Sequence, residues 1–360
     1  MKVLLLAGGA SNEREVSLTS GEAVFEALQR LGHEVRAIDP ANGKSLLGSD
    51  GRFITAGASD STQEVVVTKA NSPALVKALS SSRFEDVDVV FVALHGGAGE
   101  NGAIQCLLEL AGKAYTGSSM TASAVAMDKA ITKRLFATAK IPTPDWKLYR
   151  LVSSEVDDPL VEKIRNRFSF PIIVKPNDSG STIGLSKVDN KADLLPALRM
   201  ATRESCNVLI EKYIPGRELT VAVLDDQALP VVEIKAAGGL YDYEAKYTKG
   251  KSEYIVPADV EPEISKSIQE AATKAYNIIR ASGLVRIDFI LADSGEFYCL
   301  EVNTLPGMTS LSLAPMAAQA VGIGFDDLIS RLIASALDRH NSRSGFDPPK
   351  AGRNPTSLSG

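Results

Sequence analysis

Short apolar runs alternate with longer amphipathic stretches over the first third of the chain. The predicted strands are Lys2 to Ala7, His33 to Ile38 and Val87 to Leu94, and the predicted helices are Ser17 to Leu31 and Ala103 to Leu110. Strands that alternate with helices in this order predict a parallel sheet covered by helices. Ligands of such sheets bind beyond the carboxyl ends of the strands, where Gly8-Gly9 and His95 fall.

The pattern changes after a long helical stretch from Met120 to Ala139. Short strand-like runs then follow one another, several joined by tight turns, which predicts a mainly antiparallel arrangement. These runs are Pro171 to Lys175, Ile183 to Val188, Asn207 to Tyr213, Glu218 to Leu224, Pro230 to Ile234, Val285 to Leu291 and Glu296 to Val302. One helix is predicted among them, from Glu263 to Ala281.

Two segments lack this order. Residues 41–72 are rich in Gly, Ser, Asp and Thr and read as a variable insertion with one strand-like run, Val65 to Thr68. The end of the chain, from Ser342 to Gly360, has no periodicity and predicts a disordered tail.

Composition narrows the class of protein without indicating a reaction. The 360 residues suggest two or three domains, and 39 basic against 44 acidic residues give a net charge of −5, which does not favour nucleic-acid binding. No apolar run approaches the roughly 18 residues that a membrane span needs, and the run from Val3 to Ala7 is too short for a signal peptide. The three scattered cysteines indicate free thiols and a reducing, cytoplasmic location.

A loop of small and hydroxyl residues joins two predicted strands in the middle of the chain. The loop spans Asn177 to Thr182, and Lys175 stands just before it. Small residues let backbone N–H groups approach an anion, and the lysine adds a positive charge for a phosphate. An ordinary hairpin turn would have the same composition, so the loop alone leaves both interpretations open.

Oxygen ligands are spaced along two later strands. Glu301 and Asn303 lie on one face of the second strand, and Arg286 and Asp288 lie on one face of the strand before it. If the strands pair, Asp288, Glu301 and Asn303 converge into an oxygen-rich site that suits Mg²⁺ and nucleotide phosphates. A half-exposed hairpin with a cross-strand ion pair would show the same alternation.

Two further segments carry polar or aromatic groups into loops. The charged stretch Glu211 to Glu218 follows an apolar strand. It could hydrogen-bond to the edge of an adenine and to a ribose, or it could be a charged loop at the surface. The stretch Tyr241 to Tyr247 holds three tyrosines beside glycines, which favours an ordered lid over a flexible spacer.

Acidic residues follow the first glycine turn. Glu13 and Glu15 beyond Gly8-Gly9 suit an ammonium ligand, although Ser17 could simply cap the helix there. His95 is the only histidine at a predicted strand end, and such a histidine is more often packed and hydrogen-bonded than catalytic.

Taken in order, these segments resemble the D-alanine–D-alanine ligase family of the ATP-grasp superfamily. The matching segments are GGASNEREVSLTSG (8–21), ALHGGAGENGAIQ (93–105), YTGSS (115–119), MDK (127–129), FPIIVKPNDSGSTIG (170–184), IEKYIPGRELTV (210–221), YDYEAKY (241–247), RIDF (286–289) and LEVNTLPGMTSLSL (300–313). The resemblance implies an α/β and α+β fold with the three-domain ATP-grasp architecture. The implied parts are an N-terminal parallel α/β domain (1–117), a central domain (118–213), a C-terminal domain (214–337) and a tail (338–360).

The resemblance also implies a role for each matched residue. Those implied to contact ATP are Lys129, Lys175, Glu211, Lys212, Ile214, Glu218 and Lys246. Those implied to bind the amino acids or take part in the reaction are Glu15, His95, Ser181, Tyr247, Arg286, Gly307, Ser312 and Leu313. Those implied to hold two Mg²⁺ ions, with Mn²⁺ as a substitute, are Asp288, Glu301 and Asn303.

Within this set, Glu15 would bind the ammonium of the first D-alanine, and Ser181 would link it to Tyr247. Arg286 and the N–H of Gly307 would form the oxyanion site. The expected activity is ATP-dependent ligation of two D-alanines through a D-alanyl phosphate, for peptidoglycan precursors, in a cytoplasmic homodimer that binds neither nucleic acid nor membrane.

Three positions depart from the family pattern: Asn101, Ser179 and Leu311. Leu311 stands where the family often has a histidine, which keeps D-lactate or D-serine open as the second substrate. A nucleotide-binding protein that has lost catalysis is a further alternative, although the chain retains Arg286 and the three expected metal ligands.

Overall fold

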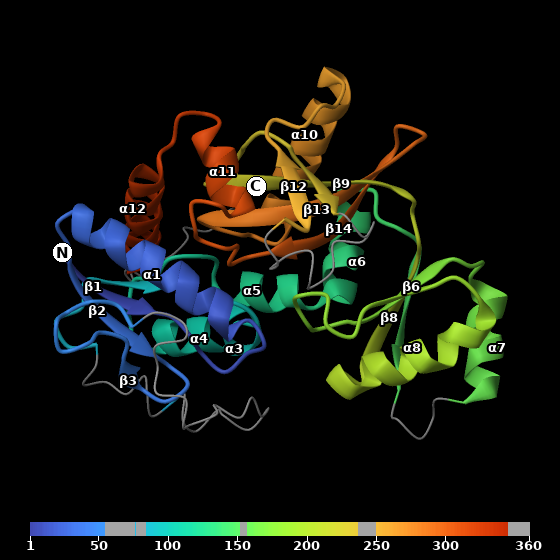
Figure 1. The fold of residues 1–360 in the computed structure, drawn as a ribbon, viewed down its shortest axis with the longest axis horizontal. Coiled ribbons are helices and arrows are strands. Elements are labelled where there is room, and N and C mark those ends of the chain that lie inside the picture. Colours follow the sequence, from blue (N-terminus) through green and yellow to red (C-terminus); the bar gives the residue numbers. More distant parts are fainter. Residues whose placement is uncertain (55–75, 77–83, 152–156, 237–249, 345–360) are drawn as a thin grey trace, which may run out of the picture.

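The computed structural model describes residues 1–54, 76, 84–151, 157–236 and 250–344. Figure 1 shows three groups of elements, each built on one sheet. The first sheet has the order β3-β2-β1-β4 and consists of β1 (Lys2–Leu6), β2 (Glu34–Asp39), β3 (Lys44–Ser45) and β4 (Val89–Val92). β1 pairs in parallel with β2 and β4, which confirms the predicted parallel sheet.

Helices cover this sheet. α1 (Arg14–Arg30) and α4 (Ala103–Leu110) match the two predicted helices, and the short α3 (Gly97–Glu100) was not predicted. α1 begins three residues before the predicted start at Ser17, whose hydroxyl lies inside the helix and donates to the carbonyl of Ala93. The short strand β3 lies in the expected insertion, whereas Val65 to Thr68 falls outside the described residues.

The second sheet is antiparallel, with the order β5-β8-β6-β7. Its strands are β5 (Trp146–Arg150), β6 (Ile172–Pro176), β7 (Ser186–Val188) and β8 (Asn207–Lys212), and its helices are α7 (Asp158–Arg167) and α8 (Lys191–Glu204). The prediction that β7 begins at Ile183 is wrong, because the loop that follows β6 extends to Leu185. β5, α7 and α8 were not predicted from the sequence.

The third sheet is also antiparallel, with the order β12-β11-β9-β13-β14 and β10 paired to β9. Its elements are β9 (Gly216–Leu224), β10 (Gln227–Ala228), β11 (Val232–Ala236), β12 (Ser252–Ile255), β13 (Leu284–Ala292), β14 (Phe297–Asn303) and the helix α10 (Pro262–Ile278). The predicted antiparallel character of this half of the chain is confirmed.

The predicted single helix from Met120 to Ala139 is two helices. α5 (Met120–Met127) and α6 (Lys129–Ala139) meet at Asp128, whose extended backbone breaks the helix and whose carboxylate accepts a hydrogen bond from Ile131 N at 2.9 Å. Phe136 of α6 belongs to the same apolar core as the inner face of the third sheet. The segment expected in the central domain therefore packs against the C-terminal sheet, and the domain limits stay a prediction.

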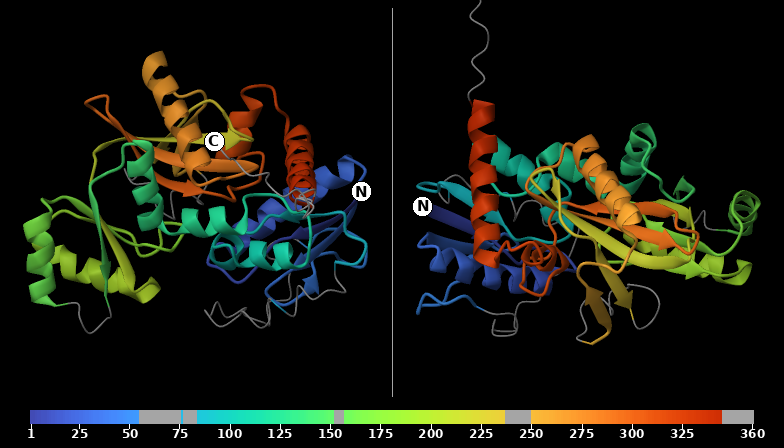
Figure 2. Two further views of the ribbon diagram at one scale, coloured as in Figure 1. Left: turned by 180° about the vertical axis from the view of Figure 1, so that it is seen from behind. Right: turned by 90° about the horizontal axis from the view of Figure 1, so that it is seen from above.

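Two C-terminal helices return to the first sheet. α11 (Leu313–Gln319) precedes α12 (Phe325–Ser344), which contacts α1 and β4 and lies beside the first sheet in Figure 2. Leu328 and Ile333 of α12 share one apolar core with Leu5 and Phe91. The expected tail from residue 338 is corrected, because α12 continues to Ser344; residues 345–360 lie outside the described part.

Arg339 fixes α12 to the junction between the first and third sheets. Its guanidinium donates to the carbonyls of Tyr115 and Gly117 and to Ser282 Oγ, and it lies 4.6 Å above the Tyr115 ring. One planar cation thereby joins residues that precede α5 and β13. Among the described helices, none is long and apolar enough to cross a bilayer.

We expect Arg339→Ala to lower the free energy of unfolding by about 2 kcal/mol, because several charge-assisted hydrogen bonds are lost together. Urea unfolding followed by circular dichroism measures this change. Arg331→Ala is the matched control on α12: its ion pair with Asp327 is half exposed, and its loss should cost less than about 0.5 kcal/mol. Equal effects of the two substitutions would contradict the role assigned to Arg339.

Candidate active site

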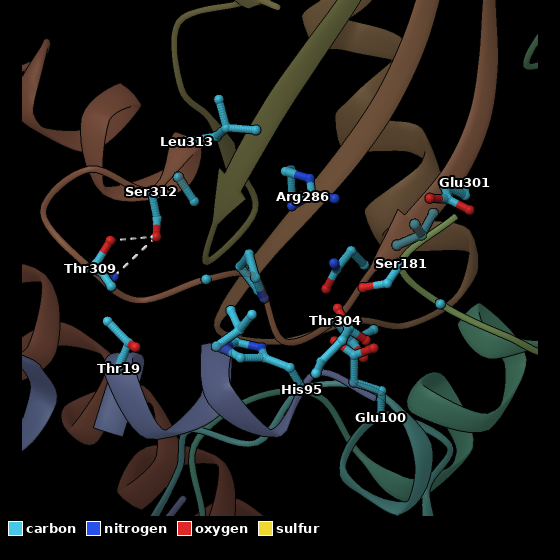
Figure 3. Close-up of a pocket in the computed structure, with 18 of the residues that line it drawn as sticks. Thr19, His95, Glu100, Ser181, Arg286, Glu301, Thr304, Thr309, Ser312 and Leu313 are labelled. Atoms are coloured by element: carbon cyan, nitrogen blue, oxygen red, sulfur yellow. Dashed lines mark hydrogen bonds between the residues drawn. The ribbon is translucent and has the colours of Figure 1, made fainter. Parts of the chain in front are cut away.

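A cleft of about 710 Å³ lies where the three groups of elements meet. Figure 3 shows its two sides: Arg286, Ser181 and Glu301 face the cleft from one side, and Thr19, His95 and Glu100 face it from the other. The predicted site residues that line it are Glu15, His95, Lys129, Ser181, Arg286, Glu301, Asn303, Gly307, Ser312 and Leu313. Residues more than 290 positions apart in the chain are thus brought to one cavity.

The β13–β14 hairpin has the register that the sequence spacing suggested. Asp288 pairs directly with Glu301, and Arg286 pairs directly with Asn303, so the four side chains share one face. Arg286 Nε and Nη2 lie 2.9 and 3.0 Å from the two oxygens of Asp288, and Thr220 donates to the same carboxylate at 2.7 Å. The cross-strand convergence is therefore present, together with an ion pair along one strand.

These donors suit a hard cation bound through few protein ligands. Two carboxylates and one amide oxygen can each donate to Mg²⁺, which keeps waters and phosphate oxygens as its remaining ligands. No group of three or more His, Cys, Asp or Glu able to hold a metal occurs in the described ranges. Asp288, Glu301 and Asn303 fit an open site in which water and phosphate oxygens complete the coordination.

The loop between β6 and β7 reaches the cleft at Ser179 to Ser181. β6 and β7 pair as a hairpin, so the turn interpretation is right, and its tip also lines the cavity. Ser181 and Thr182 both have positive φ, at 53° and 62°, an unfavourable conformation for non-glycine residues that turns successive backbone groups toward one side. Asn177 joins this loop to α6, since its carbonyl accepts from Lys129 N at 3.2 Å.

Lys129 connects the loop to the hairpin. Its Nζ donates to the carbonyl of Ser179 at 2.8 Å and lies 3.3 Å from Glu301 Oε2. The side chain is buried at the first residue of α6, so its charge stands between the loop tip and the carboxylate face. A phosphate entering here would meet a lysine, backbone groups of the loop and the oxygen ligands of β14.

A second, fully buried charge cluster lies behind the loop. Glu211 Oε1 is 2.7 Å from Lys133 Nζ, and its Oε2 is 2.8 Å from Lys175 Nζ. Burial would raise the pKa of Glu211, but the two lysines lower it below its ordinary value. Burial would likewise lower the pKa of Lys175, and Glu211 with Glu301 raises it instead.

His95 joins the segment after β14 to α1. Its Nδ1 lies 2.9 Å from the carbonyl of Leu305, and its Nε2 lies 2.9 Å from Ser20 Oγ. Since a carbonyl only accepts, Nδ1 carries the proton and Ser20 donates to Nε2; Ser20 Oγ in turn accepts from Met308 N at 3.2 Å. Burial lowers the pKa of His95. Both ring nitrogens are hydrogen-bonded, so this histidine has the packed, hydrogen-bonded role expected for it, at the edge of the cleft.

The segment after β14 is folded tightly around Ser312. Thr309 N donates to Ser312 Oγ at 3.1 Å, and a Cβ on Gly307 would lie only 2.8 Å from that oxygen. A side chain at Gly307 would therefore displace Ser312, and the segment needs glycine there. Gly307, Ser312 and Leu313 are consequently held together on one wall.

Several predicted residues are not on the cleft walls or lie outside the described part of the chain. Those that do not line the cavity are Asp288, Lys175, Glu211, Lys212, Ile214 and Glu218. Glu218 is in β9, which pairs with β11 and β13. Lys246 and Tyr247 lie outside the described residues.

The sequence reading assigned no role to Lys133 and Glu100. Lys133 follows Lys129 by four positions, the spacing that places two side chains on one helix face, and this signal could have indicated a second lysine near the site. Glu100 is buried and lines the cleft from α3, but a single acidic residue after a glycine turn carries no such signal.

Two family models match the chain. The model described as D-ala D-ala ligase N-terminus matches residues 2–118, and the model described as D-ala D-ala ligase C-terminus matches residues 135–334. Among curated relatives, D-alanine–D-alanine ligase from Syntrophotalea carbinolica is 41% identical over 93% of this chain and 96% of its own length. The enzyme of that name from Gloeobacter violaceus is 41% identical over 94% of this chain and 100% of its own.

Solved structures agree with the sequence relatives. D-alanine–D-alanine ligase from Bacillus anthracis complexed with ATP superposes with a TM-score of 0.75 at 28% identity, over 95% of this chain and 99% of that one. VanG D-Ala:D-Ser ligase from Enterococcus faecalis gives 0.74 at 30% identity, over 93% and 99%. With both family models and near-full-length relatives in agreement, the chain belongs to the D-alanine–D-alanine ligase family and has its ATP-grasp fold.

Proposed function

We propose that the chain joins two D-alanines into D-alanyl-D-alanine with the consumption of ATP, for peptidoglycan precursor synthesis. The observation that carries this proposal is the β13–β14 face, where Arg286, Asp288, Glu301 and Asn303 meet Lys129 and the loop at Ser181 in one cleft. That face offers oxygen ligands beside cations, which is the combination that phosphoryl transfer to a carboxylate needs.

The chemistry explains why one cleft must hold three substrates. An amine cannot displace an oxide from a carboxylate directly, so the first D-alanine attacks the γ-phosphate of ATP through a carboxylate oxygen and releases ADP. The resulting D-alanyl phosphate is attacked by the amine of the second D-alanine, and phosphate leaves. Water would hydrolyse the acyl phosphate, so the site must be closed, and the segment from Tyr241 to Tyr247 is the expected lid.

ATP would lie between the second and third sheets. Lys129, Lys175 and the loop at Ser181 would face its phosphates, with Lys246 reaching them from the lid. Glu211, Lys212, Ile214 and Glu218 would surround adenine and ribose. Since both oxygens of Glu211 already contact lysines, we expect this residue to act through its main chain rather than its carboxylate.

Asp288, Glu301 and Asn303 would hold Mg²⁺, for which Mn²⁺ could substitute. A bound divalent cation neutralises phosphate charge. Arg286 and the N–H of Gly307 would stabilise the oxyanion formed when the second amine attacks, because both lie on the same cleft as the expected acyl phosphate. Ser312 and Leu313 would hold the carboxylate of the second D-alanine.

Glu13 is better placed than Glu15 for the ammonium of the first D-alanine. A Cβ added to Gly96 would lie 2.5 Å from Glu13 Oε2, and one added to Gly180 would lie 3.1 Å from it. The carboxylate of Glu13 therefore lies between the turn after β4 and the loop between β6 and β7. Glu15 also lines the cleft but is exposed on the first turn of α1. We therefore assign the main contact to Glu13 and a lesser one to Glu15.

Glu100 would keep the charge of this wall low. Burial and the charge of Glu13 raise the pKa of Glu100 to about 8, so it is largely protonated at neutral pH. One carboxylate then faces one substrate ammonium.

We further propose a cytoplasmic homodimer, since ATP is a substrate and the resemblance implies dimers formed through the N-terminal domain.

The deciding experiment measures ADP release with ATP, Mg²⁺ and D-alanine, and identifies the product by mass spectrometry. We expect ADP and D-alanyl-D-alanine in equal amounts, with no activity in excess EDTA. Parallel reactions add D-lactate or D-serine, because Leu311 is 77% exposed at the cleft and could alter the second subsite. No ADP release with D-alanine alone, or ADP without dipeptide, would refute the proposal.

Replacing the two acidic residues separately tests their assignment. We expect Glu13→Gln to raise the KM for the first D-alanine by about tenfold or more, because an ammonium loses its charged partner, and Glu15→Gln to raise it by less than about threefold. Initial rates over a range of D-alanine concentrations give these values, and the KM for ATP serves as the internal control. A larger effect from Glu15→Gln would reverse the assignment.

Glu100 predicts a pH-dependent stability difference. Folding raises the pKa of Glu100 from its ordinary value of 4.5 to about 8. The stability that the protonated carboxyl group contributes is therefore fully present below pH 4.5 and is lost as the pH rises through 8. Relative to the wild type, Glu100→Gln should therefore gain stability by up to about 1.4 kcal/mol per pH unit across this window. Urea unfolding of both proteins at pH 5, 6.5 and 8 measures the difference, and a difference that does not change with pH would contradict the raised pKa.

A further inference from the structure

Three charged side chains form a closed group beneath the phosphate loop, which we call the Lys–Glu–Lys cluster: Lys133 of α6, Glu211 of β8 and Lys175 of β6. Lys133, Glu211 and Lys175 are 1%, 2% and 7% exposed. Each oxygen of Glu211 contacts one lysine, at 2.7 Å for Lys133 and 2.8 Å for Lys175. The carboxylate is thus divided between a lysine near the expected phosphates and a lysine behind them.

Lys133 is also fixed on its far side. Its Nζ donates to Thr143 Oγ1, and Thr143 Oγ1 donates to the carbonyl of Cys299 at 2.8 Å. Cys299 is in β14, two positions before Glu301. The cluster therefore runs from the second sheet through α6 to the strand that carries an expected Mg²⁺ ligand.

The charges of the cluster do not cancel. Two ammonium groups and one carboxylate leave one net positive charge, and the low pKa of Glu211 and the raised pKa of Lys175 favour these ionised forms. Burial lowers the pKa of Lys133, and Glu211 offsets this only in part. Without Lys133, the same carboxylate would neutralise Lys175 alone, and the cluster would have no net charge.

We propose that Lys133 is a positioning residue for nucleotide binding: it occupies one oxygen of Glu211 and so leaves Lys175 with a positive charge for the phosphates of ATP. This proposal rests on the proposed contact between Lys175 and ATP. It differs from a purely structural ion pair in one respect. A structural pair would affect adenosine and ATP binding alike, whereas a charge effect acts only on ligands that carry the phosphates.

The experiment measures dissociation constants of ATP and of adenosine for the full chain by calorimetry, without turnover. We expect Lys133→Met to weaken ATP binding by about tenfold and to change adenosine binding by less than about twofold. The double variant Lys133→Met/Glu211→Gln removes one charge of each sign, so Lys175 keeps its net charge. Its ATP affinity should return to within about threefold of the wild type.

Two further variants keep the test decisive if the single substitution unfolds the protein, since it leaves a buried carboxylate with one partner fewer. Glu211→Gln alone raises the net charge of the cluster. Because Glu211 also belongs to the expected adenine site, its ATP affinity is compared with its adenosine affinity, and this ratio should not fall. Lys191→Met is the matched control, because Lys191 pairs with Glu162 at the surface of the same group of elements and should leave ATP affinity unchanged.

The outcomes separate this inference from the proposed function. ATP binding that is no better in the double variant than in Lys133→Met would overturn the inference, as would equal losses of ATP and adenosine affinity. If Glu211→Gln alone weakened ATP binding more than adenosine binding, the charge argument would be wrong as well. A wild type that binds ATP but releases no ADP with D-alanine would instead count against the proposed function and leave the role of Lys133 standing.

Discussion

The register of β13 against β14 is the constraint on which the site depends. Asp288 lies opposite Glu301 and Arg286 opposite Asn303, so a shift of one residue would turn the side chains of one strand to the opposite face. The inner face of the same hairpin carries Ile287, Phe289 and Cys299, which are completely buried. Burial of that face fixes the register, and the fixed register in turn holds two carboxylates together despite their repulsion.

The other walls are brought to this face by helices that pack across group boundaries. α6 lies against the inner core of the third sheet while its first residue, Lys129, contacts both the phosphate loop and Glu301. α12 joins the core of the first sheet, and Arg339 binds the junction at Tyr115 and Ser282. The cleft is therefore lined by segments whose own apolar faces are buried elsewhere, which allows polar groups to remain along it.

The sequence predicted those parts of the site in which a local pattern determines the outcome. Alternation along two strands was enough to predict that Asp288, Glu301 and Asn303 could converge, and the pairing confirms it. The glycine turns after β1 and β4 were placed at the correct edge of the sheet for the same reason. The helices α7 and α8 were missed, although Asp157 and Asn190 cap them in the usual way. α8 contains Pro196, a residue that usually ends a helical pattern.

What could not be predicted is the partnership between charges. The sequence shows Lys133, Lys175 and Glu211 as three separate ionisable residues, and only the packing of α6 on the second sheet makes them one buried cluster. A net charge of −5 over the chain says nothing of this local arrangement. Burying a lysine is unfavourable unless a carboxylate accompanies it, yet a carboxylate would cancel the charge that a phosphate requires. One carboxylate shared by two lysines satisfies both demands, because each ammonium has a partner and one positive charge is left over.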